Sequence, residues 1–438
     1  MIPHMQKTAT ILRYSLIALV VLIVIGLAWW YFFLNSKGET VRETDAGRGA
    51  GQDAPSFGSA IGSTYDNILS SLATLAGNAD GEGTTTPPRL LQVSKTPTAG
   101  LGFTGSGLPA AAGATQAGAS TALRFVERST GYVLEVAVHP ADGGAKSGVV
   151  TRLTNTLIPR VYEAKVSRDG RVIERFLDGT NGAVATILGN IPAASTTAGD
   201  TLRALTQTRL PDDIRSIAFG PDGKELFYIT SGETGGAVGV RVNADGAKPQ
   251  KIFSSSILGW HAEWLRDGRI ILVQNASDGV PGYAYELGKS GSLSPLVAAT
   301  QGLTLLPRPS SSALVFGASS GSSLTLYAQL DKKSSVSELP LRTIADKCVW
   351  SPSEQFIVFC AVPQRPTPAN FLDLWHRGEV HTADAWWRVD MSAGRTELLY
   401  SPGDIMLDVE NPAIDGEGEY IAFMNAADKS LWLLRINE

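Results

Sequence analysis

The chain has 438 residues, enough for two or three ordinary domains or for one large domain built of repeats. Charged residues make up 18% of it, below the usual quarter, and its 46 glycines favour a turn-rich β protein over a helical one. The formal net charge of −5 is small for this length, and the sequence has no stripe of basic residues. Composition therefore argues against a nucleic-acid-binding protein.

The first distinctive segment is the apolar run "SLIALVVLIVIGLAWWYFFL" at residues 15–34, which contains no charged residue. About twenty apolar residues allow a helix to cross a hydrocarbon core of about 30 Å. Trp29, Trp30 and Tyr31, near its end, suit the headgroup region of a bilayer. A cleaved signal peptide is the alternative, but its apolar part would be shorter and followed by small residues. We expect an uncleaved transmembrane signal anchor.

Charge counting alone does not fix the orientation of this span. Two basic residues lie on each side of it, Lys7 and Arg13 before and Lys37 and Arg42 after. The shortness of the preceding segment favours a cytoplasmic tail at residues 1–14. We therefore expect a single-pass membrane protein whose C-terminal part is extracytoplasmic.

Residues 35–88 are rich in small and polar residues, a composition that buries too little to fold alone. We expect them to form a flexible linker. Within this segment, apolar residues recur at helical spacing over residues 57–76. That spacing predicts a short helix, which would either dock on the folded domain or associate with a partner.

From residue 89 onward, one strand–turn–strand pattern recurs along the chain. "RSIAFGPDGKELFYITSG" begins at Arg215, and "WHAEWLRDGRIILVQNAS" begins at Trp260. Similar hairpins start at Tyr162, Leu303, Asp346 and Asn411. Most are followed by an alternating third strand and a short fourth one. Four antiparallel strands per repeat are typical of a β-propeller blade.

An irregular unit at residues 98–155 precedes these six hairpins, so the count is seven blades. The last unit stops after three strands, and "RLLQVSK" at residues 89–95 resembles the fourth strand that it lacks. The sequence therefore predicts an all-β seven-bladed propeller at residues 89–438. Pairing of residues 89–95 with a strand near Leu431–Arg435 would close the ring and remove exposed sheet edges.

The hairpins "FGPDGKELFYIT" and "WSPSEQFIVFCAV" resemble the WD40-like, TolB-type propeller repeats of bacterial envelope proteins. This resemblance covers residues 89–438. Over its whole length, the chain is similar to a family of single-span bacterial proteins of unassigned function. The resemblance implies a propeller that binds protein partners in the envelope. A TolB-type propeller follows a separate α/β domain, whereas here the predicted membrane span takes its place.

Equivalent positions of six inner strands are polar, and the positions that follow them are apolar or small. This alternation predicts a polar ring at the mouth of the central channel and an apolar face packed between blades. The ring residues are Glu163, Ser216, His261, Thr304, Lys347 and Asn411. They could simply hydrogen-bond around channel water. Alternatively they bind a small molecule or a peptide end, with Glu163, His261 and Lys347 as the charged or titratable members.

The sixth repeat carries the largest insert, residues 363–386, on the same face as the polar ring. Long loops in compact folds are often functional. The aromatic and histidine side chains of the insert either form a patch for a protein partner or pin the loop to the domain; they are Phe371, Trp375, His376 and Trp386. The histidines and aspartates at 373, 376, 381 and 384 do not form a recognisable metal motif, and we expect neither a metal nor another cofactor.

Cys348 and Cys360 fall roughly opposite each other in one hairpin. A disulfide between them is possible if their Cβ atoms lie within about 4 Å, and it would suit an oxidising exterior. Two buried thiols are the alternative. Two cysteines cannot form a zinc site by themselves.

One stretch matches an enzymatic motif: "GASSG", residues 317–321, fits G-x-S-x-G. A nucleophile elbow joins a strand to a helix, whereas this stretch joins two predicted antiparallel strands. We therefore interpret Ser319 as a turn residue.

The function that we expect is a membrane-tethered, extracytoplasmic scaffold that binds a protein, peptide or other ligand in the cell envelope. The alternative is a propeller hydrolase or lyase that acts on envelope saccharide or peptide through the channel-mouth residues. A sensor that signals through the span is a third hypothesis, although residues 1–14 leave little room for an output module.

Overall fold

A computed structural model describes residues 88–105, 121–139, 149–179, 182–192, 202–233, 235–274 and 277–437. They belong to the second of two compact units, Gly83–Glu438. The predicted tail, the span at 15–34, the helix at 57–76 and the linker up to residue 87 lie outside the described residues. Within the described ranges, no helix is both long and apolar enough to cross a membrane.

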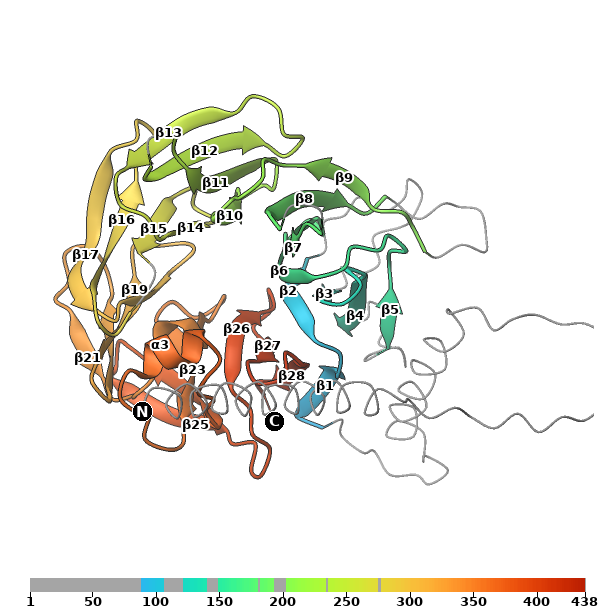
Figure 1. The fold of residues 1–438 in the computed structure, drawn as a ribbon. Helices are drawn as coiled ribbons and strands as arrows, with labels where there is room; N and C mark the ends of the chain where they lie inside the picture. The colour runs from blue at the N-terminus through green and yellow to red at the C-terminus, as the bar shows by residue number, and fades with distance from the viewer. Residues whose placement is uncertain are drawn as a thin grey trace, which may run out of the picture. The chain divides into compact units, whose positions relative to one another are not determined.

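The described residues of this unit form seven four-stranded antiparallel sheets around a central axis (Figure 1). Blade one contains β2 (Thr98–Thr104), β3 (Thr121–Glu127), β4 (Val133–His139) and β5 (Val150–Arg152). Blade two contains β6 (Val161–Val166), β7 (Val172–Leu177), β8 (Val184–Asn190) and β9 (Thr206–Arg209). Blade three contains β10 (Ser216–Phe219), β11 (Glu225–Ser231), β12 (Ala237–Asn243) and β13 (Gln250–Ser255). Blade four contains β14 (Trp260–Trp264), β15 (Ile270–Gln274), β16 (Pro281–Leu287) and β17 (Leu293–Gln301).

The remaining blades complete the ring. Blade five contains β18 (Thr304–Pro307), β19 (Leu314–Ser320), β20 (Ser323–Gln329) and β21 (Ser337–Leu339). Blade six contains β22 (Cys348–Trp350), β23 (Ile357–Pro363), β24 (Asp384–Asp390) and β25 (Arg395–Tyr400). The short helix η1 (Ala345–Lys347) precedes β22, and α3 (Phe371–His376) lies in the insert between β23 and β24. Blade seven contains β26 (Val409–Ile414), β27 (Tyr420–Asn425), β28 (Leu431–Arg435) and β1 (Leu90–Ser94). The predicted seven-bladed all-β propeller is confirmed.

Tight turns between the first two strands of blades two to four explain why these segments fold as hairpins. Each turn has an Asp-Gly pair, and the glycines Gly170, Gly223 and Gly268 have φ angles of 87°, 68° and 89°. Residues with a Cβ rarely adopt this left-handed region, so glycine is required here.

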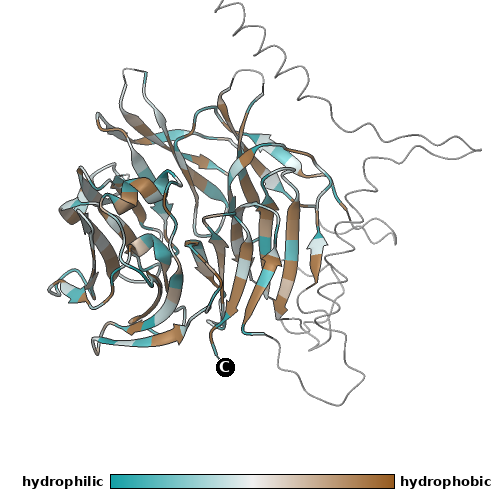
Figure 2. Cartoon of the chain, turned by 60° about the horizontal axis from the view of Figure 1, so that its bottom comes forward, coloured by the Kyte–Doolittle hydropathy of each residue, from teal (hydrophilic) through white to brown (hydrophobic). Residues whose placement is uncertain are grey.

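The core lies between neighbouring blades, and β11 shows how the sequence builds it. Leu226 and Tyr228 pack in the apolar cluster toward blade two, while Phe227 and Ile229 pack in the cluster toward blade four. Successive side chains of a strand point to opposite faces, so a continuous apolar strand serves two interfaces at once. Figure 2 shows apolar residues, in brown, concentrated along the strands.

The two ends of the propeller sequence meet in blade seven, where β1 pairs antiparallel with β28. Leu90 lies opposite Leu434 and Leu91 opposite Leu433. The backbone N–H of Arg435 also donates to the carbonyl of Arg89 at 2.8 Å. This is the pairing predicted from the sequence, and it supplies the fourth strand of the last blade.

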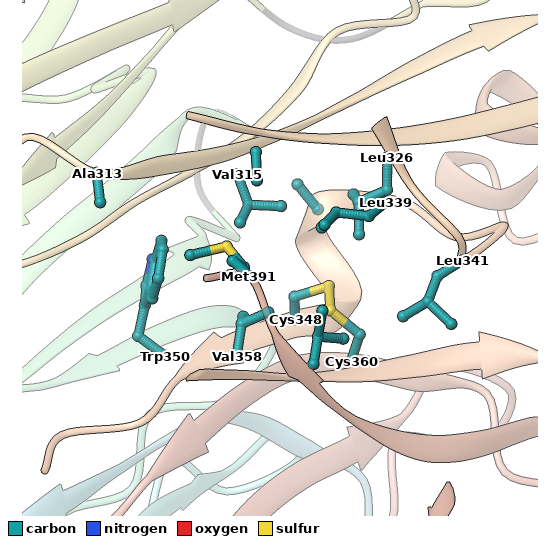
Figure 3. Packing of buried hydrophobic residues seen from close by; sticks show 13 residues of the cluster. Ala313, Val315, Leu326, Leu339, Leu341, Cys348, Trp350, Val358, Cys360 and Met391 are labelled. Atoms are coloured by element: carbon teal, nitrogen blue, oxygen red, sulfur yellow. A yellow bond between two sulfur atoms is a disulfide. The ribbon is translucent and has the colours of Figure 1, made fainter. Parts of the chain in front are cut away.

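Cys348 and Cys360 form a disulfide between neighbouring strands β22 and β23. Both residues are buried in the cluster that joins blades five and six, together with Val315, Leu326 and Val358 (Figure 3). The bond therefore crosslinks a hairpin from within the core.

Glu174 on β7 is a fully buried acid. Its side chain is 0% exposed, and neither carboxylate oxygen has a hydrogen-bond partner in the described part of the chain. Burial raises the pKa of Glu174 to about 8, so this carboxyl is neutral at pH 7. Burial of a neutral carboxyl costs far less free energy than burial of a carboxylate.

Candidate functional site

The inner strands run in the same direction, so their first residues lie at one end of the channel and their last residues at the other. A cavity of about 690 Å³ lies at the first end. We call it the α3 cavity. Its wall includes His261, Glu263, Thr304, Asp346, Trp375 and His376, which come from blades four, five and six and from α3. Part of the polar ring, namely His261, Thr304 and Asn411, thus lines one cavity together with residues of the blade-six insert.

Helix α3 lies over blade six, beside the channel, and is held on one side by blades four and five (Figure 1). Phe371 and Leu372 pack with Leu324 in a separate apolar cluster. Asp278 accepts a hydrogen bond from the backbone N–H of Asp373 at 3.0 Å, which satisfies a free donor in the first turn of the helix. The Ser319 hydroxyl in turn donates to Asp278. Ser319, which belongs to the stretch that matches G-x-S-x-G, thus hydrogen-bonds the carboxylate that binds the first turn of α3.

On its other side, α3 is held by a buried ionic network centred on Lys347. The Lys347 ammonium lies 2.6 Å from Asp384 and 2.5 Å from Asp408, and it also donates to Thr382 at 2.7 Å. The Trp375 indole N–H donates to Asp408 at 2.9 Å, and the Lys347 Nζ lies 5.2 Å from the centre of the Trp375 ring. We call Lys347, Thr382, Asp384, Asp408 and Trp375 the Lys347 network.

The charged groups of the Lys347 network are closed to solvent. The side chains of Lys347 and Asp384 are 0% exposed and that of Asp408 is 1% exposed. Burial alone would raise the pKa of Asp408, but the Lys347 charge and hydrogen bonds from Trp375 and His381 hold it below its ordinary value. The network therefore fixes α3 over blades six and seven and leaves Lys347 without a free donor for a ligand.

The other residues of the polar ring differ in whether they bond to neighbouring groups or line the α3 cavity. Glu163 forms an ion pair with Arg175. The Ser216 hydroxyl accepts from the backbone N–H of Ala262 at 3.0 Å, and the Thr304 hydroxyl accepts from that of Ala345 at 2.9 Å. These hydroxyls tie neighbouring blades together. His261, Thr304 and Asn411 line the α3 cavity, whereas Glu163, Ser216 and Lys347 are not part of its wall.

Among the aromatic and histidine residues of the insert, His376 is the most accessible. Its side chain is 38% exposed, and its Nε2 lies 3.7 Å from a carboxylate oxygen of Asp346. Phe371 and Trp386 are buried, at 0% and 2% exposure, and Trp386 packs against Phe423 at the interface between blades six and seven. Trp375 is 9% exposed and lines the cavity.

Two titratable groups on β14 face the channel at alternate positions. Burial, with a smaller contribution from the Lys165 charge, lowers the pKa of His261 to about 4. Burial raises the pKa of Glu263 to about 7, although the Lys165 charge opposes that shift. At pH 7, His261 is therefore neutral and Glu263 is near the midpoint of its titration.

Carboxylates outnumber cations around the α3 cavity. Glu410 pairs with Lys429 at 2.5 Å, Asp373 accepts from Ser277 at 3.3 Å, and Asp346 lies beside His376. Glu263 has no hydrogen bond or ion pair in the described part of the chain. The described residues contain no cluster of three or more potential metal ligands.

Sequence reasoning missed Glu263 and Lys165. Both lie two residues after a predicted ring position, and strand periodicity places such residues on the same face. The sequence therefore contained the pattern that identifies Glu263 and Lys165, but the prediction of the polar ring used only one position of each inner strand.

No protein-family model matches the sequence, and no curated protein matches it either. Solved structures do align with it. The β-propeller domain of the Trilobed protease from Pyrococcus furiosus is 10% identical, with a TM-score of 0.46 over 73% of this chain and 94% of that one. TolB from Acinetobacter baumannii is 14% identical, with a TM-score of 0.39 over 76% and 79%. An oligogalacturonate lyase in complex with manganese is 12% identical, with a TM-score of 0.43 over 79% and 99%. Similarity at this level concerns the propeller fold alone.

Proposed function

We propose that this protein is a binding scaffold whose ligand enters the α3 cavity with a cationic group, such as a peptide N-terminus or a lysine side chain. The observation that carries the proposal is the position of Glu263. Its carboxyl lies in the wall of a cavity of about 690 Å³ and has no ionic partner in the described residues. A cleft or cavity with a few convergent polar groups is the usual form of a ligand site.

The surrounding charges support a cationic ligand rather than an anionic one. Asp346, Asp373 and Glu410 share the wall with Glu263. Of the nearby cations, Arg377 is paired with Glu379 and Lys429 with Glu410, which leaves the charge of Lys165 to oppose a cationic ligand. Neutral His261 adds no positive charge at pH 7. A bound cation would favour the ionised form of Glu263 and replace the water lost on burial.

This proposal predicts a specific pH dependence. Because only ionised Glu263 attracts a cation, affinity for a lysine side chain should rise from pH 6 to pH 8 as the carboxyl loses its proton near pH 7, and level off above pH 8. A peptide N-terminus loses its own charge near pH 8, so its affinity should pass through a maximum between about pH 7 and pH 8. Glu263→Gln should weaken binding about tenfold at pH 8 and abolish the rise in affinity with pH. Titration of the full chain with peptides bearing free or acetylated N-termini, with and without lysine, measures both effects.

Glu338→Gln is the matched control, because Glu338 is a solvent-exposed carboxylate on β21, 52% exposed, and neither Glu338 nor its partner Arg342 lines the α3 cavity. It should bind like the unchanged protein. Equal affinity of Glu263→Gln and the unchanged protein at pH 8 would exclude the cationic-ligand proposal.

The second candidate is a hydrolase or lyase that acts on saccharide or peptide. It is favoured by the two neighbouring groups whose pKa values are displaced in opposite directions, His261 and Glu263, a pattern found in acid–base catalysis. Turnover of a saccharide or peptide panel that Glu263→Gln abolishes, while binding of the same substrate persists, would select this candidate over the scaffold.

We also propose that residues 15–34 tether the propeller to a membrane and that the propeller is extracytoplasmic. The support is the uncharged apolar run itself. Alkaline extraction should leave the full chain in the membrane fraction, and a chain lacking residues 1–34 should be released. Recovery of the full chain in the soluble fraction would contradict the tether.

A further inference from the structure

A second cavity, of about 530 Å³, lies at the end of the channel opposite α3. It is lined by the last residues of inner strands and by the turns that follow them. Arg168 and Arg266 reach it from blades two and four, and Phe103, Phe219 and Trp264 contribute aromatic rings to its wall. We call these five residues the arginine mouth.

The two arginines occupy equivalent places in a repeated turn, Arg-Asp-Gly-Arg. In blade two, Asp169 pairs with the second arginine, Arg171, at 2.5 Å. In blade four, Asp267 pairs with the second arginine, Arg269, at 2.8 Å. In each turn, the second arginine therefore neutralises the aspartate, and the first arginine has no carboxylate partner within the turn.

The other carboxylates of the wall are engaged elsewhere. Asp222 accepts from the backbone N–H of Lys224 at 3.0 Å and lies 3.9 Å from the Lys224 ammonium. Glu417 accepts from the Thr121 hydroxyl at 3.1 Å. Within the ranges that the structure describes, neither Arg168 nor Arg266 has a side-chain hydrogen bond or an ion pair.

Glycines leave the Arg168 guanidinium uncovered. A Cβ at Gly105 would lie 3.2 Å from Arg168 Nε, and one at Gly416 would lie 3.7 Å from Arg168 Nη2. The guanidinium thus extends past blade one toward blade seven, over positions with no side chain. Partial burial of the Arg266 guanidinium and the neighbouring Arg168 charge lower the pKa of Arg266, so the two cations repel each other across the mouth. An anion between them would relieve this repulsion.

We propose that the arginine mouth binds the carboxylate or phosphate group of a ligand whose apolar part lies against Phe103, Phe219 and Trp264. Guanidinium groups present planar pairs of donors that match both kinds of oxyanion, and charge-assisted bonds of this type are the strong ones. This inference is independent of the α3 cavity, which lies at the other end of the channel and has an acidic wall.

The test is a calorimetric titration of the full chain with phenyl phosphate and with N-acetylphenylalanine. N-acetylphenylalanine amide, which lacks the negative charge, serves as the neutral counterpart. At least one of the two acids should bind, and the amide should bind at least tenfold more weakly than the corresponding acid. Preference for the phosphate identifies a phosphorylated ligand, and preference for the carboxylate identifies a peptide C-terminus or another organic acid; either result supports the proposal.

Variants of the two arginines test whether the acid binds at the arginine mouth. Arg168→Gln and Arg266→Gln should each weaken binding of the acid about tenfold or more, whereas Arg365→Gln should leave it unchanged. Arg365 is a matched control because it is an exposed arginine on the blade-six insert, at the opposite end of the channel. All three replacements are of exposed side chains, and circular dichroism should show an unchanged fold.

Two further variants should move affinity in opposite directions. Gly416→Asp places a carboxylate beside Arg168 and should compete with the ligand, which lowers affinity. Glu417→Gln removes the one carboxylate of the wall that has no cationic partner and should raise it. Absence of binding by both acids, equal binding of acid and amide, or unchanged binding in Arg168→Gln and Arg266→Gln would each overturn the proposal.

Discussion

Lys347→Met should lower the free energy of unfolding by about 3–5 kcal/mol, because it leaves two carboxylates in the core without their cation. Asp384 and Asp408 are 0% and 1% exposed, and both lie within 2.6 Å of the Lys347 ammonium. Methionine preserves the length of the side chain, so lost packing contributes little. Chemical denaturation followed by tryptophan fluorescence measures the change.

Lys332→Met is the control for this prediction. Lys332 forms a surface ion pair with Glu286 and is 59% exposed, so its loss should cost about 0–1 kcal/mol. Adding Asp384→Asn and Asp408→Asn to Lys347→Met should restore part of the stability, because no charge then remains buried. A loss below about 1 kcal/mol in Lys347→Met would show that the network does not hold α3 in place.

Deletion of residues 90–94 should destabilise the propeller by about 5 kcal/mol or more and expose the edge of β28. Val93 is 5% exposed, Leu90 packs in the cluster between blades six and seven, and β1 pairs with β28 along the strand. Burial of aliphatic side chains contributes about 1.5–3 kcal/mol each, and ladder hydrogen bonds contribute about 1 kcal/mol each. Denaturant unfolding measures the loss of stability.

An exposed strand edge is also a template for pairing with other chains. The deletion should therefore produce dimers or larger species in light scattering. Deletion of residues 80–84, five residues of the segment predicted to be a linker, is the matched control and should change neither stability nor size. Full stability after deletion of residues 90–94 would mean that β1 does not close the ring.

Local patterns determined most of the fold. The Asp-Gly turns required left-handed glycines, and the strands around them alternate apolar side chains toward two neighbouring blades, as Phe227 and Tyr228 show. These signals act over a few residues. They recur along the chain, and the repeat itself identified the blades.

The same patterns were less informative about the site. Alignment of the turns placed Lys347 with the channel-facing residues, but Lys347 lies in η1, ahead of β22, and its ammonium is buried against Asp384 and Asp408. Its partners follow it by 37 and 61 residues. No short-range pattern records such a pairing, because an ion pair depends on distance in space.

By itself, the sequence determined the number of blades, their strands and the segment that closes the ring, because hydrophobic alternation and turn chemistry are local. Only the tertiary structure decided which polar residues remain accessible. Folding paired Lys347 and Glu163 with partners, left Glu263 unpaired beside α3, and brought Arg168 and Arg266 to one mouth. The physical reason is that burial, pairing and access to a ligand all depend on the neighbours of a charged group in space, and these neighbours come from distant parts of the chain.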